Sequence, residues 1–159
     1  MGRPPEFFRE RNNTMSYQTW HNYGFGISTE LLETANVSRI KALIHCAPSY
    51  EATVANLFQD SGIIEPIADD YLELERNNSY GIASIMADVI EEAENLLLTA
   101  CNNFDGTNYL LYMPSYPWGL RVDETSLTEE RVREIIEKYA AILSDEPVEV
   151  GYESVENGG

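Results

Sequence analysis

The sequence predicts an α+β domain: a small, mostly antiparallel sheet of about four strands, including one central hairpin, with about five helices packed on one face. Three observations favour this class. Aromatic and β-branched residues form short runs near both ends and in the middle of the chain. Apolar residues recur at helical spacing between these runs, and an Asp105-Gly106 pair separates the two middle runs. The predicted order is therefore strand, several helices, hairpin, helix, strand.

The first strand is expected in Tyr17–Ser28, where aromatic residues dominate and two glycines allow a bulge or a close approach of a neighbouring backbone. A first helix is expected over residues 37–47, because apolar residues recur there at helical spacing and the run halts at Pro48. Ser49 is the expected N-cap of a second helix, which ends just before Gly62.

Pro66 predicts the first turn of a third helix, which carries acidic residues on one side and an apolar stripe on the other. The stripe consists of Ile64, Ile67, Ala68, Tyr71 and Leu72. A fourth helix starts near Ile82 and follows the i, i+3, i+4, i+7 template of an amphipathic helix through Ala93. Four acidic residues occupy the remainder of this helix without one basic neighbour.

The runs "NLLLTACN" and "NYLLYMP" predict the hairpin, because Asp-Gly supplies the positive φ angles of a tight connection. The segment "SLTEERVREIIEKYAAILS" predicts a fifth helix with Ser126 or Thr128 as its N-cap. The alternation of apolar and acidic residues in "PVEVGYES" predicts a half-buried final strand.

The composition indicates a packed, strongly acidic domain. Hydrophobic residues make up 43% of the 159, and the formal net charge is −17. Such a charge repels nucleic acid and anionic membranes and attracts basic protein surfaces. The sequence contains no apolar run of the roughly 18 residues that a bilayer span needs. We expect a cytoplasmic protein whose two cysteines, Cys46 and Cys101, are both buried thiols.

Residues 1–14, "MGRPPEFFRERNNT", differ from the rest of the chain in composition. They contain two prolines and three arginines, whereas residues 15–159 contain seven Lys and Arg against 25 Asp and Glu. We interpret residues 1–14 as a flexible leader or an added extension, and residues 15–159 as a single domain.

The residues that usually carry catalysis or bind metals are few. The only imidazoles, His21 and His45, and the two thiols do not occur at the spacing of a known metal site, and no phosphate-binding loop is present. We therefore expect no metal, no cofactor and no catalytic residue. The alternative is a small enzyme that uses Tyr17, His21 or a carboxylate in a pocket at the open face of the sheet.

Two groups of residues are candidates for binding a partner. The first consists of carboxylates on the polar sides of the third and fourth predicted helices: Glu65, Asp69, Asp70, Glu73, Asp88, Glu91, Glu92 and Glu94. The second is the aromatic pair Tyr116 and Trp118, which follows the hairpin and either folds back over the hydrophobic edge or stands exposed as an anchor.

Several segments of the chain, "NYGFGIS", "FDGTNYLLYMPSYPW", "LTEERVREIIEKYAAIL" and "YESVENGG", resemble small acidic proteins of gram-positive gut bacteria and their phages and mobile elements. The resemblance covers most of residues 17–159 and implies no activity and no residue roles. It implies only a context, because the accessory genes of mobile elements include many inhibitors of host defence, such as anti-CRISPR and anti-restriction proteins.

The charge and this context together predict a non-enzymatic interaction module that binds a basic protein surface. Its narrower form is a nucleic-acid mimic, because four carboxylates between Asp88 and Glu94 span about 10 Å of helix, and a DNA duplex carries about six phosphates over a similar length. An accessory domain with no separable activity remains a further alternative.

Overall fold

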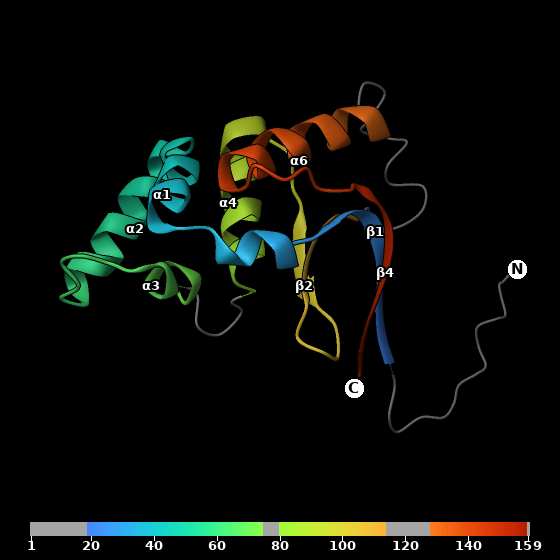
Figure 1. Cartoon of the computed structure of the whole chain (residues 1–159), viewed down its shortest axis with the longest axis horizontal. Coiled ribbons are helices and arrows are strands. Elements are labelled where there is room, and N and C mark those ends of the chain that lie inside the picture. Colours follow the sequence, from blue (N-terminus) through green and yellow to red (C-terminus); the bar gives the residue numbers. More distant parts are fainter. Residues whose placement is uncertain (1–18, 75–79, 114–127, 159) are drawn as a thin grey trace, which may run out of the picture.

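The computed structural model describes residues 19–74, 80–113 and 128–158, and these residues form an α+β fold, as predicted. Five α-helices and a four-stranded antiparallel sheet make up the described part (Figure 1). The elements are β1 (Thr19–Ser28), the 3-10 helix η1 (Glu30–Thr34), α1 (Val37–His45), α2 (Pro48–Asp60), α3 (Ala68–Leu72), α4 (Ile82–Glu94), β2 (Thr99–Asn102), β3 (Asn108–Tyr112), α6 (Glu129–Leu143) and β4 (Gly151–Gly158).

The strand order in the sheet is β2-β3-β1-β4, so that β1 lies between the hairpin and the final strand. The long pairing between β1 and β4 runs from Thr19 opposite Gly158 to Gly26 opposite Gly151. A Cβ atom at Gly26 would overlap the carbonyl oxygen of Leu110 on β3. The close backbone approach predicted from the glycines is therefore confirmed at Gly26.

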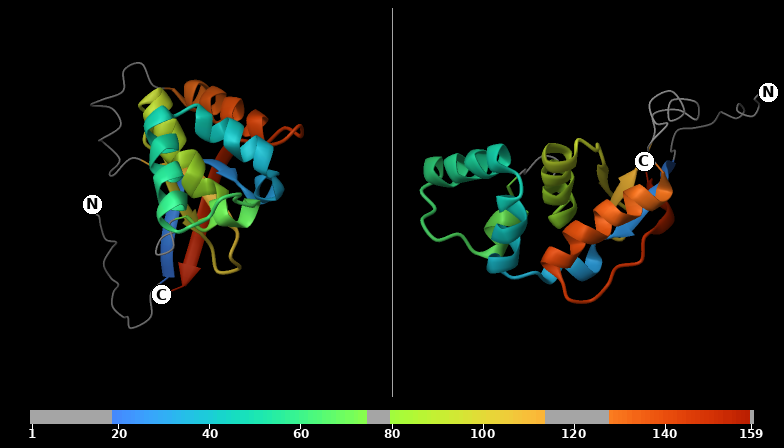
Figure 2. Two further views of the ribbon diagram at one scale, coloured as in Figure 1. Left: turned by 90° about the vertical axis from the view of Figure 1, so that its left-hand side faces the viewer. Right: turned by 90° about the horizontal axis from the view of Figure 1, so that it is seen from above.

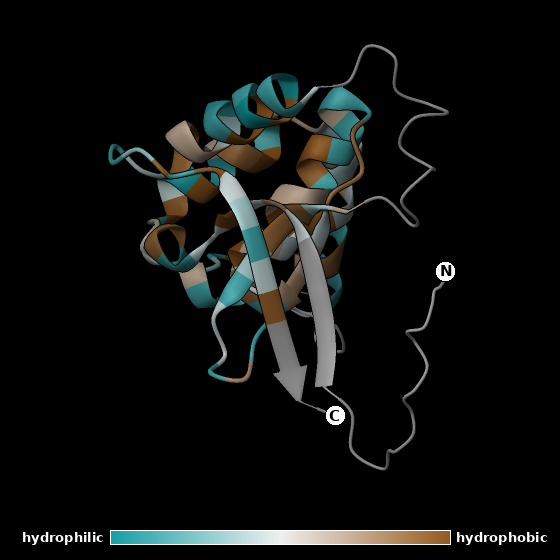
Figure 3. Cartoon of the chain, turned by 90° about the vertical axis from the view of Figure 1, so that its right-hand side faces the viewer, coloured by the Kyte–Doolittle hydropathy of each residue, from teal (hydrophilic) through white to brown (hydrophobic). Residues whose placement is uncertain are grey.

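The helices lie on one side of the sheet in two tiers. The first tier consists of α4, which packs on β2 and β3, and α6, which packs on β1. The second tier consists of α1, α2 and α3, and α4 lies between this group and the sheet (Figures 1 and 2). Hydrophilic residues follow the outer turns of the helices (Figure 3). One continuous core joins β1, both helix tiers and β3.

The central helix α4 is the most buried of the described helices, because seven of its thirteen residues are buried. Its apolar residues follow the predicted spacing from Ile82, so the fourth predicted helix is confirmed. On the opposite face of the sheet, Leu111, Cys101 and Val155 form a smaller buried cluster. Leu110 and Leu111 belong to different clusters because successive side chains of a strand point to opposite faces.

Two details of the predicted second and third helices are wrong. Helix α2 begins at Pro48 rather than after Ser49, because proline suits the first turn of a helix and a carboxylate from α4 accepts the N–H of Ser49. Helix α3 begins only at Ala68, so Pro66 precedes it. Of its predicted apolar stripe, Tyr71 is buried, whereas Ile64 is 91% and Ile67 59% exposed.

The hairpin and the fifth helix form as predicted. Gly106 has a φ of 85° in the turn between β2 and β3, and the side chain of Thr128 caps α6 by accepting the N–H of Arg131. The last strand was expected over residues 147–154 but runs from Gly151 to Gly158. Its register explains the shift, because the acidic end of the chain pairs with the start of β1.

Candidate functional site

Glu94, at the end of α4, is bound within the protein rather than turned to solvent. Its carboxylate accepts hydrogen bonds from the Tyr139 hydroxyl at 2.7 Å and from the Lys138 ammonium at 3.0 Å, and it forms an ion pair with Arg131 at 3.5 Å. Only 12% of the Glu94 side chain is exposed. The hydrogen bond from Tyr139, followed by that from Lys138, lowers the pKa of Glu94 although burial opposes this shift. Glu94 therefore joins α4 to α6.

Glu92 is exposed on α4, but it also has a structural role. Its two carboxylate oxygens accept the backbone N–H groups of Ser49 at 2.8 Å and Tyr50 at 2.9 Å. These N–H groups lie in the first turn of α2, where no residue of the helix itself can accept them. A negative charge is favourable at this end of a helix. Glu92 thus holds the start of α2 against α4.

Asp70, Asp88 and Glu91 differ from one another in exposure and contacts. The Asp70 carboxylate accepts the N–H of Ile67 at 2.8 Å and so caps the start of α3. Asp88 is half-buried and has interactions of its own in the fold. Glu91 is exposed on α4. The predicted acidic side of α4 is therefore not a uniform row of free carboxylates.

Glu65, Asp69 and Glu73 are the predicted site residues that remain exposed around α3. None of the three side chains has a cationic partner within the described parts of the chain. Asp69 lies in the first turn of α3 and Glu73 directly follows its last residue, so two like charges flank this short helix. Among the described residues, the negative charge beside α3 is therefore not balanced by an ion pair.

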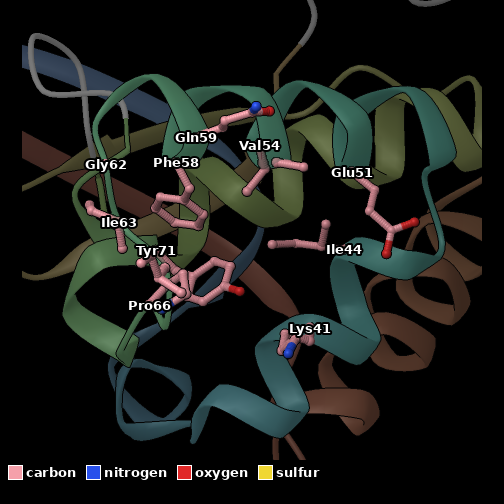
Figure 4. A pocket seen from close by; sticks show the side chains of 12 residues that line it. Lys41, Ile44, Glu51, Val54, Phe58, Gln59, Gly62, Ile63, Pro66 and Tyr71 are labelled. Carbon is pink, nitrogen blue, oxygen red and sulfur yellow. The ribbon is translucent and has the colours of Figure 1, made fainter.

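A groove opens next to these residues, between α1, α2 and α3 (Figure 4). Its volume is about 460 Å³, and Figure 4 shows side chains from all three helices around it. The apolar side chains of its wall include Ile44, Val54, Phe58 and Tyr71, all of them buried. The rings of Phe58 and Tyr71 pack edge to face, with centroids 4.9 Å apart.

The charged residues that line this groove are Lys41 on α1 and Glu51 on α2. The Glu51 carboxylate lies 3.1 Å from Nδ1 of His45, so it is partly engaged. Burial, together with the negative charge of Asp70, raises the pKa of the Tyr71 hydroxyl. The Tyr71 hydroxyl is therefore neutral at physiological pH, and the groove offers an apolar wall and few groups capable of chemistry.

This groove could not be predicted from the sequence, because the apolar spacing places Ile64, which lines the groove, in a buried stripe. In the structure Ile64 lies in the connection between α2 and α3, outside both helices, and is exposed. The predicted aromatic anchors Tyr116 and Trp118 lie outside the described residues, as does Tyr17. The His21 side chain is likewise outside them, so the predicted pocket at the sheet stays a prediction.

The remaining candidates for chemistry are dispersed. Cys101 is buried as expected, but Cys46 is exposed because it directly follows the end of α1, where its side chain contacts the Ala42 carbonyl. Across residues 19–74, 80–113 and 128–158, no three His, Cys, Asp or Glu side chains gather in a group that could hold a metal ion. Within the same residues, no helix has the length and apolar character that crossing a membrane requires.

No family model, curated protein or solved structure matches this chain.

Proposed function

We propose that the protein is a non-enzymatic interaction module that binds a basic surface of another protein. The observation that carries this proposal is the distribution of charge. From Ala42 to Leu120 the sequence contains twelve Asp and Glu but a single Lys or Arg, Arg76. A field of one sign attracts a basic partner and accelerates the encounter at low salt.

The structure adds which carboxylates are free to contribute. Glu92 and Glu94 are hydrogen-bonded to other groups of the protein, whereas Glu65, Asp69 and Glu73 are exposed around α3 and lack cationic partners among the described residues. We therefore place the binding surface around α3; Glu91 is also exposed, but it lies on α4.

The narrower proposal is that the partner is a nucleic-acid-handling enzyme of a host defence system, whose basic channel the acidic residues occupy in place of phosphates. The high charge density supports this form. Because α3 has five residues and α4 is largely buried, the mimicry would rely on a short acidic surface rather than on two parallel helices.

The test is a capture experiment from host lysate at low and high salt. The immobilised proteins are the wild type, the triple variant Glu65→Gln, Asp69→Asn, Glu73→Gln, and a matched control, Glu137→Gln, Glu146→Gln, Glu149→Gln. Both triple variants remove three exposed charges, but the control changes residues on or after α6.

We expect the wild type and the control to retain the same protein at low salt and to release it at high salt, and the first variant to retain much less. Equal retention by both triple variants would reject the surface around α3. Retention that does not change with salt would reject charge-based binding altogether.

A further inference from the structure

The groove between α1, α2 and α3 combines three properties that together indicate an occupant. It has a preformed apolar wall, exposed isoleucines beside its opening, and an acidic surround. Isolated exposed hydrophobic residues are common on proteins. Here, however, Ile64 at 91% exposure lines a groove, and Ile67, at 59%, directly follows Pro66, which also lines it.

The groove is large enough to take up a bulky side chain. At about 460 Å³ it lies within the range of preformed ligand pockets, roughly 300–1,000 Å³. Its wall is held in place by the packed rings of Phe58 and Tyr71. Because both residues are buried in the protein, the wall needs no rearrangement before a bulky apolar group enters.

The charge around the groove indicates where an occupant would carry basic residues. Between Ala42 and Leu74 the sequence contains six Asp and Glu and no Lys or Arg. Of these, Asp60, Glu65 and Asp69 are exposed at the end of α2, in the α2–α3 connection and in α3. Lys41 is the cation that lines the opposite wall, on α1. Basic residues of an occupant are therefore favoured on the α2–α3 side.

The lining of the groove favours an occupant whose backbone is helical. Helices, whose internal N–H and C=O groups bond to one another, form most of its lining. An extended peptide would find few backbone partners there, whereas a helix satisfies its own. Amphipathic helices bind grooves between helices in this way, through apolar anchors on one face.

We propose that this groove binds an amphipathic helix of the partner protein, which inserts a bulky apolar side chain against Phe58 and Tyr71 and places Lys or Arg beside the acidic residues of the α2–α3 side. This inference rests on the proposed function, because it names the chemistry of the basic partner. It also assigns affinity to an apolar anchor and not to charge alone.

A groove-filling variant tests the anchor. Ala55 is exposed on α2 and lines the groove, whereas Ala52 is exposed on the same helix and does not. Ala55→Phe fills the groove, and Ala52→Phe is the matched control with the same change in helix propensity. Circular dichroism and thermal unfolding establish that both variants fold like the wild type.

The probe is a display library of randomised peptides, selected on the immobilised full-length chain. We expect enriched peptides to carry a bulky apolar residue flanked by Lys or Arg at helical spacing. They should bind Ala55→Phe about tenfold to a hundredfold more weakly than the wild type, which is the range expected from losing one buried apolar side chain. Ala52→Phe should bind them like the wild type.

The outcomes separate this inference from the proposed function. If Ala55→Phe retains full binding and the variant Glu65→Gln, Asp69→Asn, Glu73→Gln loses it, the groove is wrong and the acidic surface stands. If the enriched peptides lack basic residues, or if none is enriched, the proposed occupant is wrong. Light scattering that shows a wild-type dimer and an Ala55→Phe monomer would make a second copy of the chain the occupant and overturn the proposal.

Discussion

Glu94→Gln should destabilise the protein, because it removes a charge but leaves a side chain of the same shape. The Glu94 carboxylate bonds to the hydroxyl of Tyr139, which is 3% exposed, and contacts two cations on α6. A hydrogen bond to a charged group contributes about 1.5–3 kcal/mol, against about 0.5–1.5 kcal/mol for a neutral one. The exposed cations Lys138 and Arg131 each contribute about 0.5 kcal/mol.

The expected loss for Glu94→Gln is therefore about 2 kcal/mol in the free energy of unfolding. For a protein of this size, that loss corresponds to a decrease of about 4–8 °C in Tm. The control is Glu91→Gln, which removes the same charge from an exposed position on the same helix. This control should change the unfolding free energy by less than about 0.5 kcal/mol.

Urea unfolding at several pH values measures both effects. Because the pKa of Glu94 is lowered in the folded protein, its charge stabilises the fold above the ordinary Glu pKa of about 4.3. That stabilisation is lost as the pH falls through the lowered value. The difference in unfolding free energy between the wild type and Glu94→Gln should thus be largest at pH 7 and should disappear in acid. Equal stability of Glu94→Gln and Glu91→Gln at pH 7 would refute the assigned contacts.

Three further substitutions test other contacts. Glu92→Gln should cost about 1 kcal/mol in urea unfolding, because it removes the negative charge at the start of α2; no loss would contradict this role. Gly26→Ala should cost 2 kcal/mol or more, of the order expected for overpacking, or prevent folding, whereas its cross-strand neighbour Gly151→Ala, with open space around it, should be tolerated. Burial and the bond to Glu94 raise the pKa of Tyr139, so stability should fall as the pH rises above about 10. Tyr139→Phe should reduce this fall, and an unchanged slope would contradict it.

The elements of the fold could be predicted because their signals are local. Helix α4 follows from six apolar residues at helical spacing, and the hairpin follows from Asp105-Gly106, whose glycine has the required positive φ. The sequence predicts Ser126 or Thr128 as the N-cap of α6, and the structure shows that it is Thr128. In each case the residues that determine the structure lie within one turn or one helix of one another.

The candidate site could not be predicted in the same way, because the contacts that define it are distant in sequence. Glu94 and Tyr139 are 45 residues apart, and Glu92 and Ser49 are 43 apart. Hydrophobic periodicity shows that a carboxylate lies off the apolar face, but it does not show what covers that position. The exposure of Ile64 could not be predicted either, because this residue lies in the connection between α2 and α3, outside both helices.

Glu33 is a further acidic residue whose carboxylate binds the start of a helix. Its carboxylate accepts the N–H of Ile82 at the start of α4 and bonds to the side chains of Thr29 and Asn108. Glu92 has the equivalent role at the start of α2 and Asp70 at the start of α3. Part of the acidic surplus thus supplies the negative groups that helix N-termini favour, and this part is not available to a partner.

This division decides which substitutions can map a binding surface. Reversing Asp88, Glu91 and Glu92 together would place a cation at the start of α2, where a positive charge is unfavourable. A loss of binding in that variant would then follow from a damaged fold as readily as from a lost contact. Neutralising Glu65, Asp69 and Glu73 removes charge without breaking a side-chain contact among the described residues, so a change in binding reports on the surface itself.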